Sequence, residues 1–324
     1  MSQFSFNKIV ILGVGLIGGS LALALKRGQA GAPAAGQIIG VGRRAASVQR
    51  ALALGVIDLA LGLDDDAALE AAVRDADIVI CAAPVAQTEP LLKRIAPWLQ
   101  GQTLISDVGS TKADAVAAAY AALGAQAWRC VPAHPIAGRE QSGVEAALAD
   151  LFVGRNTVLC PLVENSPQAV ARIAAMWQAA GAHILTLSAA QHDAVFASVS
   201  HLPHVLAFAM LEKILRDGDA QLKLALAGSG FRDFTRIAAA SPEMWRDICV
   251  ANRAALLSDL DAYQAVLQEF RQWIAQGDTE TLHTVMSRVS AAREAWRVGG
   301  SRDVAAPAAE AGPGVAPGGV SGAV

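Results

Sequence analysis

The stretch IVILGVGLIG, residues 9–18, decides the fold. Its first four residues are apolar and mostly β-branched, which predicts a buried parallel strand. The glycines that follow have GxGxxG spacing: Gly13 permits a tight turn, Gly15 lets a pyrophosphate approach the backbone, and Gly18 lets a helix pack against the strand. Alone this spacing is a weak signal. Between a strand and a helix it indicates a dinucleotide-binding turn, with a Gly-rich turn that binds nothing as the alternative.

The end of the second expected strand bears on which nicotinamide is preferred. NAD enzymes usually place an Asp or Glu there, whereas this chain has Arg43 and Arg44. Guanidinium groups bind phosphate in a bidentate manner, which favours NADP over NAD. The alternative is that both arginines are solvated and stack on adenine. The residues assigned to cofactor contact are Gly13, Gly15, Leu16, Ile17, Gly18, Arg43, Arg44, Ala83, Pro84 and Ser110.

Strand and helix patterns alternate up to residue 187, which predicts an α/β Rossmann-type, doubly wound parallel sheet. The pattern after residue 188 is helical throughout. We therefore expect a dinucleotide-binding domain over 1–187, an all-α domain over 188–297 and a disordered Gly/Ala/Pro tail over 298–324. The expected strands are 9–12, 37–41, 78–82, 103–107, 127–132, 156–162 and 183–187, and the expected helices after residue 188 are 189–215, 220–226, 242–275 and 278–296.

Composition narrows the class of protein. The 324 residues are 53% hydrophobic and 17% charged, with a net charge of −3, so the chain is globular and unlike a nucleic-acid binder. Its four cysteines are scattered, which predicts reduced thiols in a cytoplasmic protein and neither disulfides nor a zinc site.

The apolar run 9–25 resembles a signal peptide, but its glycines fit a strand, a turn and a helix better. We expect no other stretch to be apolar enough for a membrane span.

Several later motifs carry candidate chemistry. His134 follows an expected strand and has a side chain that titrates near neutrality, so it is a candidate general base, with a structural loop histidine as the alternative. Ser110 follows the strand 103–107, where ligands of α/β sheets bind. His201 and His204 share a helix face, but Pro203 lies between them and no third ligand stands at suitable spacing, so we expect no metal site.

Taken together, these motifs resemble the prephenate/arogenate dehydrogenase family. The resemblance is collinear from about residue 7 to 296, and only the tail falls outside it. It implies a Rossmann domain and a helical domain that forms a homodimer, oxidative decarboxylation of prephenate to 4-hydroxyphenylpyruvate in tyrosine biosynthesis, and NAD(P)⁺ as oxidant. The motifs are GVGLIGGS (13–20), DVGS (107–110), HPIAGREQSG (134–143), SHLPH (200–204), GFRDFTRIA (230–238) and MWRDI (244–248).

The resemblance also implies residue roles. His134 accepts the proton of the C4 hydroxyl, and Ser110 orients His134 and the nicotinamide. Arg236 binds the ring carboxylate, and His204 faces the pyruvyl side chain, or tyrosine where tyrosine inhibits. The remaining substrate-site residues are Glu140 and Asp233, which form an ionic gate with Arg236, Trp245 as a pocket wall from this or the other subunit, and His192 and Ser200 near the site.

One position bears on the choice of substrate. Arogenate has an ammonium where prephenate has a keto group, and the residue after HPIAG faces that end of the substrate in the family. This residue is Arg139, whose positive charge disfavours an ammonium, so prephenate is expected, unless Arg139 points to solvent.

Two rival functions stay open. A β-hydroxyacid or 6-phosphogluconate-type dehydrogenase shares the two-domain plan but uses a lysine in the helical domain, where the helix 189–215 has only Lys213. A dinucleotide-sensing module would bind cofactor without turnover, and it would leave His134, His204 and Arg236 without a joint purpose.

Overall fold

The computed structural model describes residues 6–28, 34–139 and 141–299. The tail beyond Gly299 and residue 140 lie outside this set, so the predictions made for them stay untested. The chain forms two compact units, residues 1–266 and residues 267–324, and the candidate site lies within the first. The secondary structure changes from mixed α/β to helical at Ser188. We therefore keep the domain boundary at 187/188 as a proposal.

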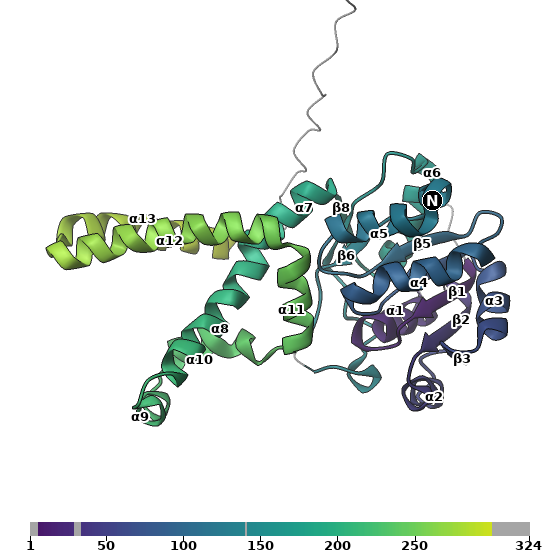
Figure 1. Cartoon of the computed structure of the whole chain (residues 1–324), viewed down its shortest axis with the longest axis horizontal. Coiled ribbons are helices and arrows are strands. Elements are labelled where there is room, and N and C mark those ends of the chain that lie inside the picture. The colour runs from purple at the N-terminus through teal and green to yellow at the C-terminus, as the bar shows by residue number, and fades with distance from the viewer. Residues whose placement is uncertain (1–5, 29–33, 140, 300–324) are drawn as a thin grey trace, which may run out of the picture. The chain divides into compact units, whose positions relative to one another are not determined.

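A five-stranded parallel sheet forms the centre of the first unit (Figure 1). Its strand order is β3-β2-β1-β4-β5, so the chain reverses direction across the sheet between β1 and β4. In α/β sheets this switch point is where ligands bind, beyond the carboxyl ends of the strands. The strands are β1 (Phe6–Leu12), β2 (Ala35–Gly42), β3 (Leu59–Gly62), β4 (Ile78–Cys81) and β5 (Leu104–Asp107).

Helices cover both faces of this sheet. Alternate β1 residues point to opposite faces: Ile9 and Ile11 pack with α1, α2 and α6, and Val10 and Leu12 pack with α3, α4 and α5. The doubly wound prediction is confirmed. The helices are α1 (Leu16–Arg27), α2 (Ala45–Ala53), α3 (Asp66–Arg74), α4 (Thr88–Ile95), α5 (Ala113–Leu123) and α6 (Pro167–Ala179), with 3₁₀ turns at Val85–Gln87, Ala96–Trp98, Gly124–Arg129 and Val144–Ala146.

The strand expected over 127–132 is wrong. Residues 124–129 form a 3₁₀ helix, and a single bridge between Ile105 and Cys130 is the one pairing of this segment with the central sheet in the described part of the chain. The strand begins only at Ala133, whose N–H donates to the Asp107 carboxylate at the end of β5. It belongs to a separate small sheet of β6 (Ala133–Pro135), β7 (Asn156–Leu159) and β8 (His183–Thr186), in which β6 and β7 are antiparallel.

The helical region is more divided than the sequence pattern predicts. The expected helix 189–215 contains a π-helical turn at Ala197–His201, directly before Pro203. Because proline lacks an N–H, the regular helical ladder is interrupted there, and π turns are frequent at functional sites. The expected helix 242–275 is divided at Asn252. The elements are α7 (Ala189–Phe196), α8 (Leu202–Leu215), α9 (Ala220–Ala225), α10 (Ser229–Thr235), a 3₁₀ turn (Arg236–Ala239), α11 (Pro242–Ala251), α12 (Arg253–Gln276) and α13 (Thr279–Gly299).

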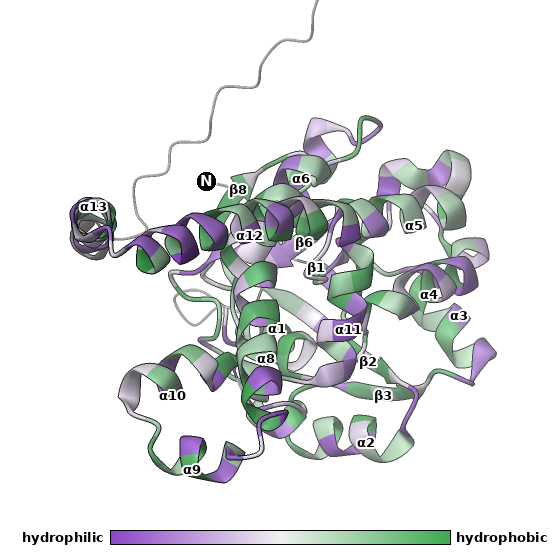
Figure 2. Cartoon of the chain, turned by 60° about the vertical axis from the view of Figure 1, so that its left-hand side comes forward, coloured by the Kyte–Doolittle hydropathy of each residue, from purple (hydrophilic) through white to green (hydrophobic). Residues whose placement is uncertain are grey.

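The run Ala189–Leu215 is long and apolar enough to cross a membrane by length and composition alone. The expectation that no later stretch would reach that level is therefore wrong. Only 22% of its most apolar window is buried within the chain, and Figure 2 shows hydrophobic colour along α8. The exposed apolar side chains of this run include Val195, Val199, Met210 and Leu215.

Candidate active site

A cleft of about 860 Å³ lies at the carboxyl ends of β1, β2 and β4. Of the residues assigned to cofactor contact, the lining includes Gly13, Gly15, Arg43, Arg44, Ala83 and Pro84. Leu16, Ile17 and Gly18 are not part of the lining and form the start of α1, while Ser110 follows β5. Part of the predicted cofactor site thus lines the cleft, and direct cofactor contact by Leu16, Ile17, Gly18 and Ser110 stays a prediction.

The three glycines of the turn have different surroundings, as their predicted roles require. Gly13 has φ of +105°, and a Cβ there would lie 2.5 Å from the carbonyl oxygen of Ala82. A Cβ on Gly18 would lie 2.2 Å from the carbonyl oxygen of Gly13, so only glycine lets α1 start so close to β1. At Gly15 a Cβ would meet nothing within 4 Å, which leaves open space beside the helix N-terminus for an anionic group.

Several lining residues escaped the sequence analysis. Ser47 and Arg50 lie on α2, and Arg50 pairs with Glu145 at 3.4 Å. Glu243, Arg246 and Asp247 come from α11 in the helical region. Ser47 and Arg50 lie about one and two helical turns after Arg43 and Arg44, so helical periodicity after the second strand would have found them. Arg246 and Asp247 belong to the motif MWRDI, but only the tertiary packing of α11 shows that they line the cleft.

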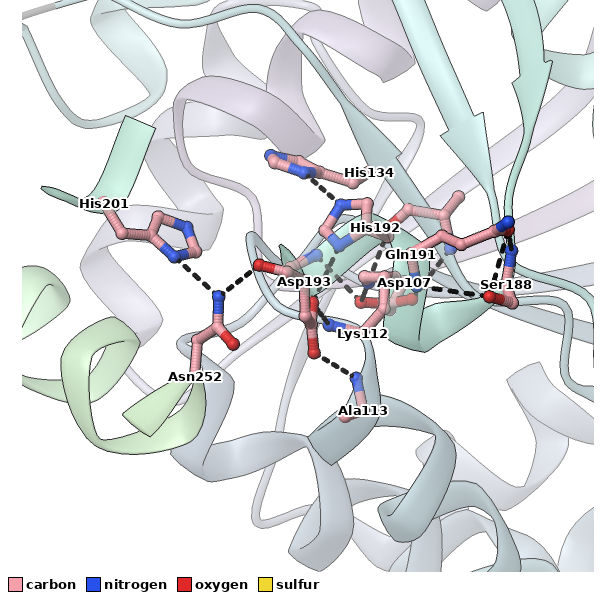
Figure 3. A network of polar contacts seen from close by, with 12 residues as sticks. Asp107, Lys112, Ala113, His134, Ser188, Gln191, His192, Asp193, His201 and Asn252 are labelled. Carbon is pink, nitrogen blue, oxygen red and sulfur yellow. Dashed lines mark hydrogen bonds and ion pairs between the residues drawn. The ribbon is translucent and has the colours of Figure 1, made fainter. Parts of the chain in front are cut away.

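His134 lies on β6 against α7 (Figure 3). Its Nδ1 lies 2.8 Å from Nε2 of His192, and Nδ1 of His192 lies 2.8 Å from a carboxylate oxygen of Asp193. Phe196 contacts both imidazoles, at ring-centroid distances of 4.8 Å and 4.4 Å. The second nitrogen of His134 has no hydrogen bond within the described ranges, so it is the nitrogen available to a ligand.

A buried ion pair fixes the backbone just before His134. The Lys112 ammonium, which is 0% exposed, contacts the Asp107 carboxylate and donates to the carbonyl oxygen of Ala133 at 2.8 Å. The other Asp107 oxygen accepts the Ala133 N–H at 3.0 Å. Both backbone groups of Ala133 are therefore held by one charge pair. Sequence analysis singled out DVGS and missed Lys112, two residues further on.

Asp193 joins α7 to the start of α5. Its two carboxylate oxygens accept the backbone N–H groups of Lys112 and Ala113, each at 2.8 Å. Its carbonyl oxygen accepts from the Asn252 amide at 2.8 Å, and the same amide lies 3.0 Å from Nδ1 of His201 (Figure 3). A carboxylate at a helix N-terminus is favourable because unpaired N–H groups and the helix dipole face it.

A second aromatic group adjoins this network. The ring of His204 stacks on Trp245 of the same chain, with centroids 3.6 Å apart, and the ring of His201 meets Trp245 edge-on at 6.0 Å. Nδ1 of His204 donates to the Ser200 carbonyl oxygen at 2.9 Å, so it is the Ser200 backbone that orients this ring. Arg236 is close enough to lower the pKa of His204. His134, His192, His204 and Trp245 therefore adjoin one contiguous network, and the charge of Arg236 acts on His204.

The other residues predicted for the substrate site have fewer contacts with this hydrogen-bond network. Asp233 is exposed on α10, one turn before Arg236, and Arg139 is exposed after β6. Ser110 follows β5, and its backbone lies beside His201. The described contacts of the His134 ring include His192 and Phe196, and no hydrogen bond to Ser110 is among them. Glu140 lies outside the described residues.

Burial keeps the histidines of the site neutral. It lowers the pKa of His134 well below its usual value, and the positive charge of Lys112 lowers it further. Burial also lowers the pKa of His192, against the opposing effect of Asp193, and it lowers the pKa of His201 to about 4. A neutral imidazole with one free nitrogen is the form that can accept a proton.

Comparison with known proteins agrees with this arrangement. The family model for the nucleotide-binding domain of prephenate dehydrogenase matches residues 21–186, and that for its dimerization domain matches residues 188–288. The chain is 36% identical over 278 residues to a prephenate dehydrogenase of Bacillus subtilis, covering 85% of this chain and 72% of that protein. It is 36% identical over 281 residues to a cyclohexadienyl dehydrogenase of Zymomonas mobilis, covering 86% and 92%.

A solved structure shares the fold as well. The prephenate dehydrogenase from A. aeolicus, in complex with hydroxyphenyl propionate and NAD⁺, superposes with a TM-score of 0.82 at 32% identity, covering 90% of this chain and 98% of that one. Two matching domain models, relatives similar over most of their length and this shared fold lead to one conclusion: the chain belongs to the prephenate dehydrogenase family.

Proposed function

We propose that this chain oxidises and decarboxylates prephenate to 4-hydroxyphenylpyruvate at the His134 site. Hydride leaves C4, the C4 hydroxyl loses its proton, and the C1 carboxylate departs as CO₂, whose bonding electrons complete the aromatic ring. The observation that carries this assignment is a neutral imidazole, His134, with one nitrogen held by His192 and the other available.

His134 serves as the general base. A base that works near neutral pH must be unprotonated there, and burial and the Lys112 charge lower the pKa of His134 accordingly. The ion pair of Lys112 and Asp107 hydrogen-bonds the backbone of Ala133. It thereby positions the His134 imidazole where the hydroxyl proton is released.

Arg236, His204 and Trp245 hold the substrate. Prephenate carries two carboxylates, and an always-charged, forked guanidinium suits the one on the ring. The stacked pair of His204 and Trp245 offers a flat wall next to a neutral imidazole nitrogen. Asp233 lies one helical turn before Arg236, within reach of the ionic gate predicted for it. Arg139 is exposed in the single chain, which fits the alternative that it points to solvent, so its role in discriminating prephenate from arogenate stays a prediction.

The cleft beside the glycine turn fits a nicotinamide dinucleotide. When bound, the oxidised cofactor supplies the acceptor for the hydride. The space above Gly15 and the start of α1 would hold its pyrophosphate. Ala83 and Pro84, after β4, would border the cofactor further along the cleft.

We propose that NADP is preferred over NAD. Arg43, Arg44 and Ser47 all line the cleft at the end of β2, where an NAD enzyme would place an acid. Two guanidiniums and a hydroxyl suit a 2′-phosphate better than two ribose hydroxyls.

We propose that a second copy of the chain covers the exposed apolar surface of the region from α7 to α8. Val195, Val199 and Met210 are exposed in the single chain, and the family model that matches this region describes a dimerization domain. Light scattering coupled to gel filtration would test it: a mass of one chain at micromolar concentration would contradict it.

The test of the proposed function is turnover of prephenate by wild type, His134→Asn and His183→Asn. His183 is an exposed histidine on β8, so its substitution is the matched control. We expect His134→Asn to bind cofactor normally but to slow turnover roughly 10²–10⁴-fold, and His183→Asn to behave as wild type. Near-normal turnover by His134→Asn would remove His134 from the mechanism.

A further inference from the structure

The buried carboxylate of Asp193 lies at the end of a line of two imidazoles. It belongs to none of the sequence motifs and has no role in the proposed reaction. The line runs from His134 through His192 to Asp193, with 2.8 Å at both junctions (Figure 3). Asp193 is 4% exposed and His192 is 0% exposed. Neither residue is placed to touch substrate directly, so any contribution to catalysis must pass through His134.

The hydrogen bonds of Asp193 favour its ionised form. One carboxylate oxygen accepts the N–H of Lys112, and the other accepts the N–H of Ala113. Hydrogen bonds from N–H groups to both oxygens stabilise the carboxylate relative to the protonated acid. Burial raises the pKa of Asp193, but the hydrogen bonds from His192, Ala113 and Lys112 outweigh it and the pKa lies below its usual value.

The ionised carboxylate determines where each imidazole carries its hydrogen. An acceptor-only group must receive a hydrogen from Nδ1 of His192. Because His192 is neutral, its Nε2 is then an unprotonated acceptor. This nitrogen in turn requires a hydrogen from Nδ1 of His134, which leaves Nε2 of His134 as a lone pair. The direction of the whole line follows from the two backbone N–H groups at the start of α5.

We propose that Asp193, acting through His192, is a positioning residue that holds His134 as the Nδ1–H tautomer, with its Nε2 lone pair directed to the substrate hydroxyl. The opposite tautomer would present an N–H to that hydroxyl and could not accept its proton. Asp193 lies on α7 and its N–H donors on α5, so the base is set correctly only while these two helices are docked. This inference rests on the proposed role of His134.

Nitrogen NMR of the full-length protein labelled with ¹⁵N-histidine tests the tautomer directly. The chain has 6 histidines, and the His134 ring is assigned by its loss in His134→Asn. We expect wild-type His134 to show a protonated Nδ1 and an unprotonated Nε2. One oxygen of Asp193 faces both Nδ1 of His192 and the N–H of Lys112. Where Asp193→Asn places its NH₂ group at this position, the amide donates to His192, both rings reverse and Nε2 of His134 becomes protonated.

Kinetics provide the second measurement. Asp193→Asn is expected to lower kcat roughly 10²–10⁴-fold, as loss of the correct tautomer does in other histidine-based sites, with KM for prephenate and Kd for cofactor within about threefold of wild type. Asn252→Ala is the matched control: it removes a buried hydrogen bond to the same residue and leaves the carboxylate in place. It should lower Tm but keep the His134 tautomer and a kcat within about threefold of wild type.

Two results would overturn the inference. One is a wild-type spectrum in which Nε2 of His134 carries the hydrogen, which can be recorded even if Asp193→Asn does not fold. The other is Asp193→Asn with wild-type kcat. If wild type shows the expected tautomer but does not turn over prephenate, the tautomer assignment stands and the proposed function fails.

Discussion

Replacing Lys112 by methionine tests whether the ion pair under His134 organises the site. The side chains of Lys112 and Asp107 are 0% and 7% exposed, so the substitution leaves a buried carboxylate whose remaining partners are the N–H groups of Gly109 and Ala133. Removing one member of a buried pair costs about 3–5 kcal/mol. Global stability of a domain is about 5–15 kcal/mol, so this loss is readily measured.

Urea unfolding is the assay for this loss of stability. Lys93→Met is the control, because Lys93 and Glu89 form an exposed pair on α4 whose loss costs about 0.3–0.5 kcal/mol. The double substitution Asp107→Asn/Lys112→Met should be more stable than Lys112→Met, since no uncompensated charge remains and the amide oxygen still accepts from Ala133.

The same substitution has a catalytic readout. The Lys112 charge lowers the pKa of His134, together with burial and the neighbouring His192 and His201. Without it the pKa of His134 rises, so the base is protonated at a higher pH and the acid limb of kcat/KM moves upward. Lys112→Met with a stability loss below about 1 kcal/mol and an unshifted acid limb would refute the reasoning.

Three further variants test the substrate site, the cofactor site and the buried His201. Arg236→Gln should raise KM for prephenate at least tenfold, about 1.4 kcal/mol of binding, with little change in kcat; an unchanged KM in steady-state assays would rule out the carboxylate role. Arg43→Ala/Arg44→Ala should raise KM for NADP⁺ more than KM for NAD⁺, and equal changes in both would contradict the proposed 2′-phosphate contact. His201 is held neutral with a pKa of about 4 against 6.5 in the unfolded chain, so acid should destabilise the fold by about 3 kcal/mol as pH falls from 6.5 to 4; His201→Gln should reduce this dependence in urea titrations at several pH values, and an identical slope would show that another group is responsible.

The sequence alone was sufficient for the parts of the fold that local patterns encode. A β-branched run, the glycine turn and the alternation of strands with helices predicted the parallel sheet and the cleft at its edge. β3 was missed because its four residues, Leu59–Gly62, are short and partly exposed. α3 was missed although Asp65 caps it, accepting the Ala68 N–H at 3.0 Å.

The residues of the candidate site also differ in whether a local sequence pattern marks them. His134, His204 and Arg236 stand in recognisable motifs, so the sequence identified them. Lys112 and Asp193 were missed because their importance arises from contacts across long sequence separations: Asp193 accepts from Lys112, and Lys112 donates to Ala133. A lone Asp on a helix predicts a solvated side chain, and only the docking of α7 against α5 makes it a buried acceptor.

Oxidative decarboxylation is tested most directly by measuring, in one reaction of the wild-type protein with prephenate, both the reduced nicotinamide formed and the CO₂ released. We expect equal amounts of the two, with 4-hydroxyphenylpyruvate as the organic product. Reduced nicotinamide without CO₂ would indicate a simple hydroxyacid dehydrogenase, and cofactor binding with neither product would indicate a sensing module; either result would contradict oxidative decarboxylation at His134.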